Sequence, residues 1–244
     1  MPEFADMRRT SLATAAALLL VGGCGSSEAP EYGKKAPVVY KRIVSMSPSA
    51  SEICGASFSR ILIGRTAACN SPGGIRAVPV MTRGIEPDLD KIKAAKPDCI
   101  VYDRDEVDSK SAAMIESTGI AVFKFGGDSI DEFVESIFEF GRVSGSEELG
   151  SKYVDKILLE RAVAIAERPE TPVRVAVIRQ DNFNQKWIAG NDGFVADVVA
   201  TAGGKPIGPD SKAWVALDPT WLATQSPQIL IVAGPLTGIS DNAV

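Results

Sequence analysis

Arg42-Ile-Val-Ser-Met-Ser-Pro-Ser-Ala-Ser-Glu52 is the stretch that decides the fold of this chain. Its first half, residues 42–46, is a mostly apolar run of the kind that forms a buried strand. Serine and Pro48 follow, and both residue types are typical of the first turn of a helix. We therefore predict a strand over 42–46 that leads directly into a helix over 49–56.

The same alternation of short apolar runs and helical segments continues to residue 125. Further strands are predicted over 61–64, 99–102 and 121–125, and helices over 89–95 and 111–118. Nearly continuous apolar strands separated by helices indicate a parallel sheet that is covered on both faces. The fold class predicted from the sequence is therefore α/β.

A long helical section comes next. The capping-box sequence Ser129-Ile-Asp-Glu opens it, and a long helix is predicted over 147–168. Apolar residues follow at helical spacing, and we assign them to the core: Ile130, Phe133, Val134, Ile137, Phe138, Val154, Ile157, Leu158, Ala162 and Ile165.

A second α/β unit begins with the apolar run at Arg174. Its predicted elements are strands over 174–178 and 229–233 and helices over 194–202 and 221–226. The sequence ends at Val244, soon after the last strand. Because a strand needs a neighbour and a covering helix, we expect this second lobe to be incomplete and the C-terminus to be truncated.

The start of the chain resembles a bacterial lipoprotein signal. The basic pair Arg8-Arg9 precedes an apolar run over 12–21, and small residues lead into Cys24. The run is half the length of the ~20 residues that span a bilayer. The resemblance implies a signal peptide over 1–23, a lipid on Cys24 and a flexible tether over 24–37. The protein would then work on the periplasmic or cell-surface side of the membrane; a buried core helix is the alternative interpretation.

Composition excludes several classes of function. The chain has 244 residues and a formal net charge of −5, which argues against a nucleic-acid partner. It contains no histidine, so Ser-His and Cys-His catalysis, HExxH zinc sites and histidine-ligated heme or zinc are excluded. We therefore expect no metal site and no cofactor of the protein's own.

The cysteines allow at most one disulfide if Cys24 carries lipid. Cys54, Cys69 and Cys99 then remain. Cys99 lies in an apolar run and is expected to be a buried strand residue. A bond between Cys54 and Cys69 is possible, and the sequence leaves it open.

Five segments in order resemble the substrate-binding proteins of ABC importers for ferric siderophores and vitamin B12. They are residues 42–52, 64–72, 87–101, 189–204 and 226–232. The resemblance implies two α/β lobes with mostly parallel sheets, joined by a single long connector helix, with the ligand cleft between the lobes. The boundaries expected on this basis are an N-terminal lobe over 38–128, a helical connector over 129–168 and a C-terminal lobe over 169–244.

The resemblance also implies contacts with a membrane permease. In this family a carboxylate on each lobe docks onto arginines of the permease. The N-lobe carboxylate corresponds to Asp90, in Leu89-Asp-Lys-Ile. The C-lobe counterpart falls at or near Thr220, which departs from the family pattern, and Asp218 is the substitute we expect.

Ligand contacts are expected on loops at the carboxyl ends of the strands, as in open α/β sheets generally. Ser47 and Ser49 offer backbone N–H groups at a helix start, which suit an anionic ligand edge. The planar guanidinium group of arginine suits the oxygen-rich shell of a chelate. Arg83 is therefore a candidate, although it could equally form a surface ion pair. Any of the tryptophans could instead belong to the core. The other candidates are Arg65, Asn70, Tyr102, Arg179, Phe183, Trp187 and Trp214.

The function expected from this resemblance is a monomeric, lipid-anchored receptor. It would capture a ferric siderophore or a corrinoid and deliver it to ABC permease subunits; Arg83 favours an anionic siderophore. Two alternatives remain. One is a truncated lipoprotein of the same fold that binds no ligand. The other is an α/β enzyme, although the sequence has no GxSxG, no GxGxxG after a strand and no P-loop.

Overall fold

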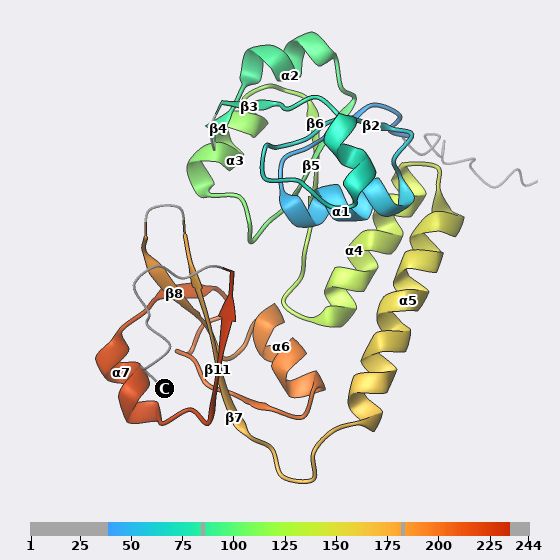
Figure 1. Ribbon diagram of the computed structural model, residues 1–244. Coiled ribbons are helices and arrows are strands. Elements are labelled where there is room, and N and C mark those ends of the chain that lie inside the picture. The colour runs from blue at the N-terminus through green and yellow to red at the C-terminus, as the bar shows by residue number, and fades with distance from the viewer. Residues whose placement is uncertain (1–38, 84–85, 182–183, 235–244) are drawn as a thin grey trace, which may run out of the picture. The chain divides into compact units, whose positions relative to one another are not determined.

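A computed structural model describes residues 39–83, 86–181 and 184–234 (Figure 1). All of these residues belong to one compact unit, residues 37–244. The predicted signal peptide, the lipidation site Cys24, the tether and Phe183 lie outside the described residues.

The first sheet is entirely parallel. It consists of β1 (Ile43–Ser45), β2 (Leu62–Gly64), β5 (Cys99–Asp103) and β6 (Ala121–Phe125), in the order β2-β1-β5-β6. This arrangement confirms the parallel sheet that the apolar runs predicted. In parallel sheets the carboxyl ends of the strands lie at one edge, so β1 and β5 end close together.

Helices cover both faces of this sheet. They are α1 (Pro48–Ser57), α2 (Leu89–Ala95) and α3 (Ser109–Glu116); the short η1 (Gly73–Ala77) and the hairpin β3 (Thr82–Arg83) and β4 (Glu86–Pro87) complete the lobe. Successive strand side chains point to opposite faces. Ile43 and Val101 therefore lie in the core beneath α1, whereas Val44 and Ile100 lie in a second core cluster with Ile92 of α2.

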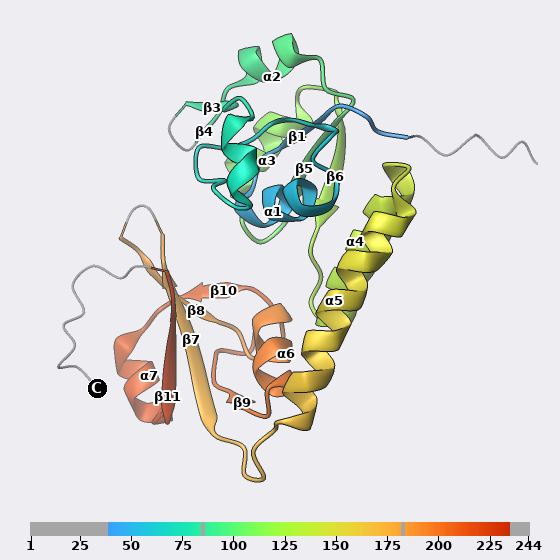
Figure 2. The ribbon, with the colours of Figure 1, turned by 45° about the vertical axis from the view of Figure 1, so that its right-hand side comes forward.

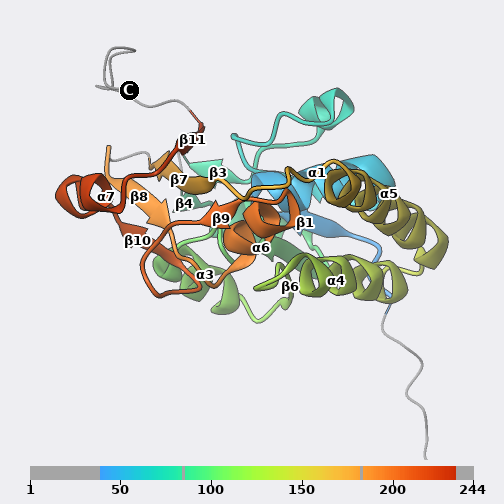
Figure 3. The same ribbon diagram turned by 90° about the horizontal axis from the view of Figure 1, so that it is seen from below.

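Two antiparallel helices follow the first sheet, α4 (Ile130–Val143) and α5 (Glu147–Ala166). They lie side by side in Figures 2 and 3 and approach closely where Gly141 faces Gly150, since a Cβ on Gly141 would lie 3.2 Å from the Cα of Gly150. The long helix predicted over 147–168 is thus confirmed to within two residues. In the part of the chain that the structure describes, no helix is both long and apolar enough to cross a membrane.

The assignment of both apolar stripes to the core is only partly right. Phe133, Ile137 and Val154 do pack in or against the core. In contrast, Phe138 is 49% exposed, and Leu158, Ala162 and Ile165 are also exposed. The physical reason is that no described element covers these side chains.

The second lobe contains a mixed sheet. Its strands are β7 (Arg174–Gln180), β8 (Lys186–Ala189), β9 (Lys205–Pro206), β10 (Trp214–Ala216) and β11 (Ile229–Ala233). The order is β10-β8-β7-β11, with β9 also on β7; β9 and β11 run parallel to β7, whereas β8 runs antiparallel to β7 and to β10. Helices α6 (Phe194–Thr201) and α7 (Pro219–Gln225) complete the lobe. Strands β8 and β10 were not predicted, and they place Arg179 and Trp187 in a hairpin rather than in a loop.

In each lobe, an arginine side chain binds the carbonyl groups at the end of a helix. The Arg42 guanidinium donates to the carbonyl oxygens of Ala95 at 2.7 Å and Lys96 at 3.1 Å, where α2 ends. The Arg174 guanidinium likewise donates to the carbonyl oxygen of Gln225 at the end of α7. These bonds satisfy carbonyl groups that a helix terminus leaves without intrahelical partners.

All three described cysteines are free and buried, so the possible bond between Cys54 and Cys69 is not formed. Cys69 Sγ instead lies 2.7 Å from Ser51 Oγ and 2.9 Å from Thr66 Oγ1. Burial raises the pKa of Cys54 well above its usual range and raises the pKa of Cys99 to about 12.

Thiol reactivity tests this arrangement, because the thiolate is the reactive form. In a form of the protein that starts after Cys24, we expect Ellman's reagent to detect almost no thiol at pH 8 in the native state. Addition of guanidinium chloride should release all three thiols. A thiol that reacts rapidly in native buffer, or a total below three after denaturation, would contradict the burial or the free state of these cysteines.

Candidate functional site

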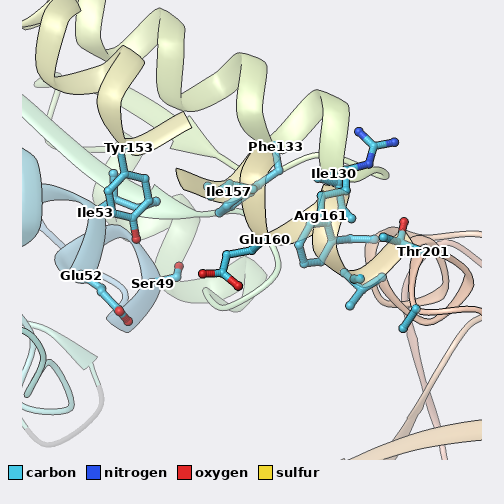
Figure 4. A pocket seen from close by; sticks show the side chains of 14 residues that line it. Ser49, Glu52, Ile53, Ile130, Phe133, Tyr153, Ile157, Glu160, Arg161 and Thr201 are labelled. Atoms are coloured by element: carbon cyan, nitrogen blue, oxygen red, sulfur yellow. The ribbon is translucent and has the colours of Figure 1, made fainter. Parts of the chain in front are cut away.

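The structure contains a cavity of about 460 Å³ bounded by elements of both lobes (Figure 4). One wall is the first part of α1, the opposite wall is α6, and the α4–α5 pair closes the side. Its volume lies within the range of about 300–1,000 Å³ that is usual for small-molecule sites. Helices rather than strand-end loops line this cavity, and of the predicted ligand contacts that the structure describes only Ser49 is among its lining residues.

Helical spacing explains why α5 lines this cavity. Tyr153, Ile157, Glu160 and Ala164 recur every three or four residues, which places them on one face of the helix. Ring contact between Phe133 of α4 and Phe194 of α6, with centroids 5.2 Å apart, joins two of the apolar walls. The cavity is therefore mainly apolar.

The polar lining residues are few, and two of them are acidic. Glu52 lies on α1, and the Glu160 carboxyl group points toward the α1 end of the cavity in Figure 4. Burial and the nearby Glu52 carboxylate raise the pKa of the Tyr153 hydroxyl. Arg161 also lines the cavity, but its guanidinium is bound to Asp131 at 2.5 Å.

The N-terminus of α1 contacts carboxylates of the protein itself. The Ser49 N–H donates to Glu106 Oε2 at 3.0 Å, and the Ser49 hydroxyl donates toward Glu106 Oε2 and Asp103 Oδ2, both at 3.1 Å. The neighbouring Ser47 is buried; its Oγ accepts from the Ala50 N–H and from the Asp103 N–H at 2.8 Å. Ser49, but not Ser47, thus borders the cavity.

Acidic residues cluster at the end of β5, where Asp103 is the last strand residue and Asp105 and Glu106 follow. Burial raises the pKa of Asp103, an effect that the bond from the Asp105 N–H opposes and the nearby Glu106 carboxylate reinforces. Burial also raises the pKa of Asp105, against the influence of Arg104. Burial at this edge of the sheet therefore already disfavours the ionised form of these two carboxyl groups.

Three of the predicted C-lobe residues lie together on the β7–β8–β10 part of the second sheet. The Arg179 guanidinium lies 4.4 Å from the ring centroid of Trp214, and Arg179 is the cross-strand partner of Trp187. Burial lowers the pKa of Arg179, and the carboxylates of Asp105 and Glu106 oppose that shift. Arg179 is thus close enough to Asp105 and Glu106 to interact with their charges, although none of the three C-lobe residues lines the cavity.

Two predicted contacts are instead engaged inside the N-terminal lobe. Arg65 is buried, and its guanidinium donates to the carbonyl oxygens of Thr66, Cys69 and Arg76, each at 3.0 Å. Tyr102 is 2% exposed and lies in the core cluster between the sheet and α2 and α3. In this structure neither side chain borders the cavity.

Arg83 forms the ion pair that was its alternative role. Its Nε lies 2.8 Å from Asp88 Oδ2 and its Nη2 lies 3.4 Å from Asp90 Oδ2. The Asp88 carboxylate raises the pKa of Arg83, and Arg83 in turn holds the pKa of Asp88 below its usual range. Asn70 is exposed, with its amide 3.2 Å from the Ala68 carbonyl oxygen.

The two candidate docking acids occupy different positions on matching helices. Asp90 follows the N-cap residue Asp88 by two positions in α2, and its side chain is 90% exposed. Asp218 is itself the N-cap of α7 and accepts from the N–H groups of Thr220 and Trp221. Thr220 is therefore the positional counterpart of Asp90.

The sequence analysis did not predict the ion pair and the hydrogen bond that connect the second lobe to α4 and the residues just before it. Asp128, just before α4, forms an ion pair with Lys212 at 2.8 Å and a second with Arg104. The Ile130 N–H donates to Asp197 Oδ2 of α6 at 2.8 Å. No sequence signal marks these pairs, and of the α5 residues that line the cavity only Ile157 belongs to the apolar stripe that the sequence analysis assigns to the core. Among the described residues, no group of three or more His, Cys, Asp or Glu side chains could hold a metal ion.

Comparisons with known proteins agree with this architecture. A family model described as "Periplasmic binding protein" matches residues 43–243. A vitamin B12-binding protein of Salmonella choleraesuis is 23% identical over 194 residues, which cover 79% of this chain and 72% of that protein.

Solved structures of the same two-lobe fold are also similar. The periplasmic heme-binding protein RhuT from Roseiflexus sp. RS-1 has a TM-score of 0.65 at 21% identity. The match covers 79% of this chain and 76% of RhuT. The periplasmic vitamin B12 binding protein BtuF of Vibrio cholerae has a TM-score of 0.65 at 19% identity. The match covers 81% of this chain and 78% of BtuF. Because the family model spans well over half of the sequence, this chain belongs to the periplasmic binding protein family.

Proposed function

We propose that this protein is the extracytoplasmic substrate-binding component of an ABC importer and carries a metal chelate of the ferric siderophore or cobalamin type. It captures the chelate between its lobes and delivers it to the permease as a monomer, without catalysing a reaction. The proposal includes a lipid anchor at Cys24 behind a signal peptide over 1–23, and the division into lobes at 38–128 and 169–244 around a connector at 129–168.

The observation that carries this proposal is the cavity between α1, α6 and the α4–α5 pair, in a chain of the periplasmic binding protein family. Its apolar walls suit the ligand periphery, and Arg179 with Trp214 supplies a polar and aromatic surface nearby. A chelated metal arrives with its ligands in place, so the protein needs no metal ligands of its own. The name of the B12-binding relative supports the same class of cargo.

Fluorescence titration tests the proposal directly. A form starting after Cys24 is titrated with ferric hydroxamates, a ferric catecholate, hemin and cyanocobalamin, while tryptophan emission is followed. We expect saturable quenching by at least one chelate, because Trp187 is the cross-strand partner of Arg179 and Trp214 stacks on its guanidinium, the polar and aromatic surface that the proposal assigns to the ligand. A folded sample that responds to none of them would contradict the proposed function.

The docking role of Asp90 gives a prediction in cells. Substitution Asp90→Ala removes an exposed carboxylate that does not line the cavity. We expect uptake of the chelate to fall roughly five- to tenfold, because a charged contact at the edge of an interface steers association, while the Kd of the isolated protein for the chelate stays unchanged.

Asp218→Ala provides the comparison. Because Asp218 caps α7, we expect this variant to lose about 1 kcal/mol of stability. Uptake is compared between the two variants at equal amounts of folded protein, so that a loss of docking can be distinguished from a loss of folded protein. If Asp90→Ala supports normal uptake, Asp90 is not a docking residue.

A further inference from the structure

We propose that the cleft selects a neutral or positively charged chelate and rejects anionic ones. This inference rests on the proposed function, because it names the charge class of the ligand that the same cleft takes. It also reverses the preference for an anionic siderophore that the sequence suggested through Arg83.

The first argument is that the natural place for an anion is already filled. A helix N-terminus with free N–H groups favours a negatively charged ligand. Here the first available donor group of α1, at Ser49, binds the Glu106 carboxylate through both its N–H and its hydroxyl. An anionic ligand group would have to displace a carboxylate that is attached to the protein.

The second argument concerns the acids around the cleft. Glu52 and Glu160 line the cavity, and Asp103 and Glu106 accept hydrogen bonds from Ser49, which also lines it. Within the described ranges, none of these four carboxylates belongs to an ion pair. Arg104 acts on Asp103 and Arg179 acts on Glu106 without forming an ion pair, so these negative charges are reduced but not neutralised. The field in a partly enclosed, apolar cavity is screened less than at an open surface.

The third argument is that the nearby cations are engaged. Arg161 is bound to Asp131, and Lys212 and Arg104 are both bound to Asp128. Arg83 is held by Asp88 and Asp90.

Arg179 is the remaining candidate to receive an anion. It stacks on Trp214 at 4.4 Å and already faces the carboxylates of Asp105 and Glu106. An anion that approached Arg179 would therefore also approach these two acids. The cleft as a whole favours a ligand whose outer surface is amide-rich, apolar or cationic.

A panel of chelates of different charge tests this inference. The probes are ferrichrome and cyanocobalamin, which are neutral, ferrioxamine B, which is cationic, and ferric enterobactin, which is a trianion. Kd values are measured by fluorescence titration at low and at physiological salt. We expect the best neutral or cationic probe to bind at least tenfold more tightly than the anion, and added salt to reduce that gap because it screens the repulsion.

Charge variants then assign the effect to residues. Glu106→Gln, and the pair Glu52→Gln with Glu160→Gln, should each improve the affinity for ferric enterobactin by about three- to tenfold relative to the best probe. The matched control for Glu106→Gln is Glu148→Gln, which makes the same change in net charge at an acid that is paired with Lys152 and does not line the cavity.

The outcomes separate this inference from the proposed function. If ferric enterobactin binds most tightly, or if Glu148→Gln has the same effect as Glu106→Gln, the charge selection is wrong while chelate binding stands. If folded protein binds no probe on the panel, the proposed function fails and the inference fails with it.

Discussion

Replacement of Phe140 by alanine is expected to lower the free energy of unfolding by about 3–5 kcal/mol. The Phe140 ring is fully buried. Its centroid lies 4.9 Å from the ring centroids of Phe58 and Phe125 and 5.0 Å from that of Phe123. The substitution therefore opens a cavity at the point where α1, α4 and β6 meet, and it removes three aromatic contacts at once. Urea unfolding followed by circular dichroism measures the loss.

Phe138→Ala is the matched control for this experiment. It makes the same chemical change two residues earlier on α4, at a side chain that is 49% exposed. We expect its effect to stay within about 0.5 kcal/mol, as for most surface substitutions. Equal losses in both variants would mean that helix propensity rather than core packing determines the effect, and the description of this core would be wrong.

The contrast between these two phenylalanines shows what the sequence could predict about the fold. Helix α2 and strands β6 and β11 begin and end at the predicted residues, because capping groups or abrupt changes in hydropathy mark both of their ends. Helical periodicity also located α4, and it located α5 to within two residues. It could not show that Phe138 is exposed, because a wide apolar stripe has the same pattern whether or not a partner covers all of it.

The mixed second sheet was harder to predict for a different reason. Strand β8 has only four residues and begins with Lys186 and Trp187 after a polar turn, and β10 has only three. Such short segments carry little periodic signal, and their register depends on pairing with β7. The local sequence therefore resembled a loop.

Prediction of the candidate site was limited because it depends on contacts between residues that are far apart in the sequence. Ser49 and Glu106 are 57 positions apart, yet their bond decides whether the start of α1 can receive an anion. Arg83 has Asp88 and Asp90 within a few positions, so its ion pair was visible in the sequence as one of two roles. Side-chain chemistry alone could not choose between ligand contact and internal pairing, because both use the same guanidinium geometry.

Filling the cavity is expected to have the largest effect on binding. Ala164 lies on the α5 face that lines the cavity, opposite Val198 and Ala202 of α6. A phenylalanine at this position would occupy space that the proposed chelate needs. An overlap of this kind costs about 2 kcal/mol, so we expect the Kd of Ala164→Phe for the best chelate to rise by about 30-fold. Isothermal titration calorimetry measures the change, and thermal unfolding verifies that the variant is folded.

Ala162→Phe makes the same substitution two residues earlier on α5, at an exposed position outside the cavity. Residues two apart on a helix face nearly opposite directions, so this control adds equal bulk to α5 without entering the cavity. Its affinity should match that of the parent protein. If Ala164→Phe also binds normally, the chelate does not enter the space between α5 and α6. Binding would then depend on the surface around Arg179 and Trp214, where Trp214→Ala should remove it instead.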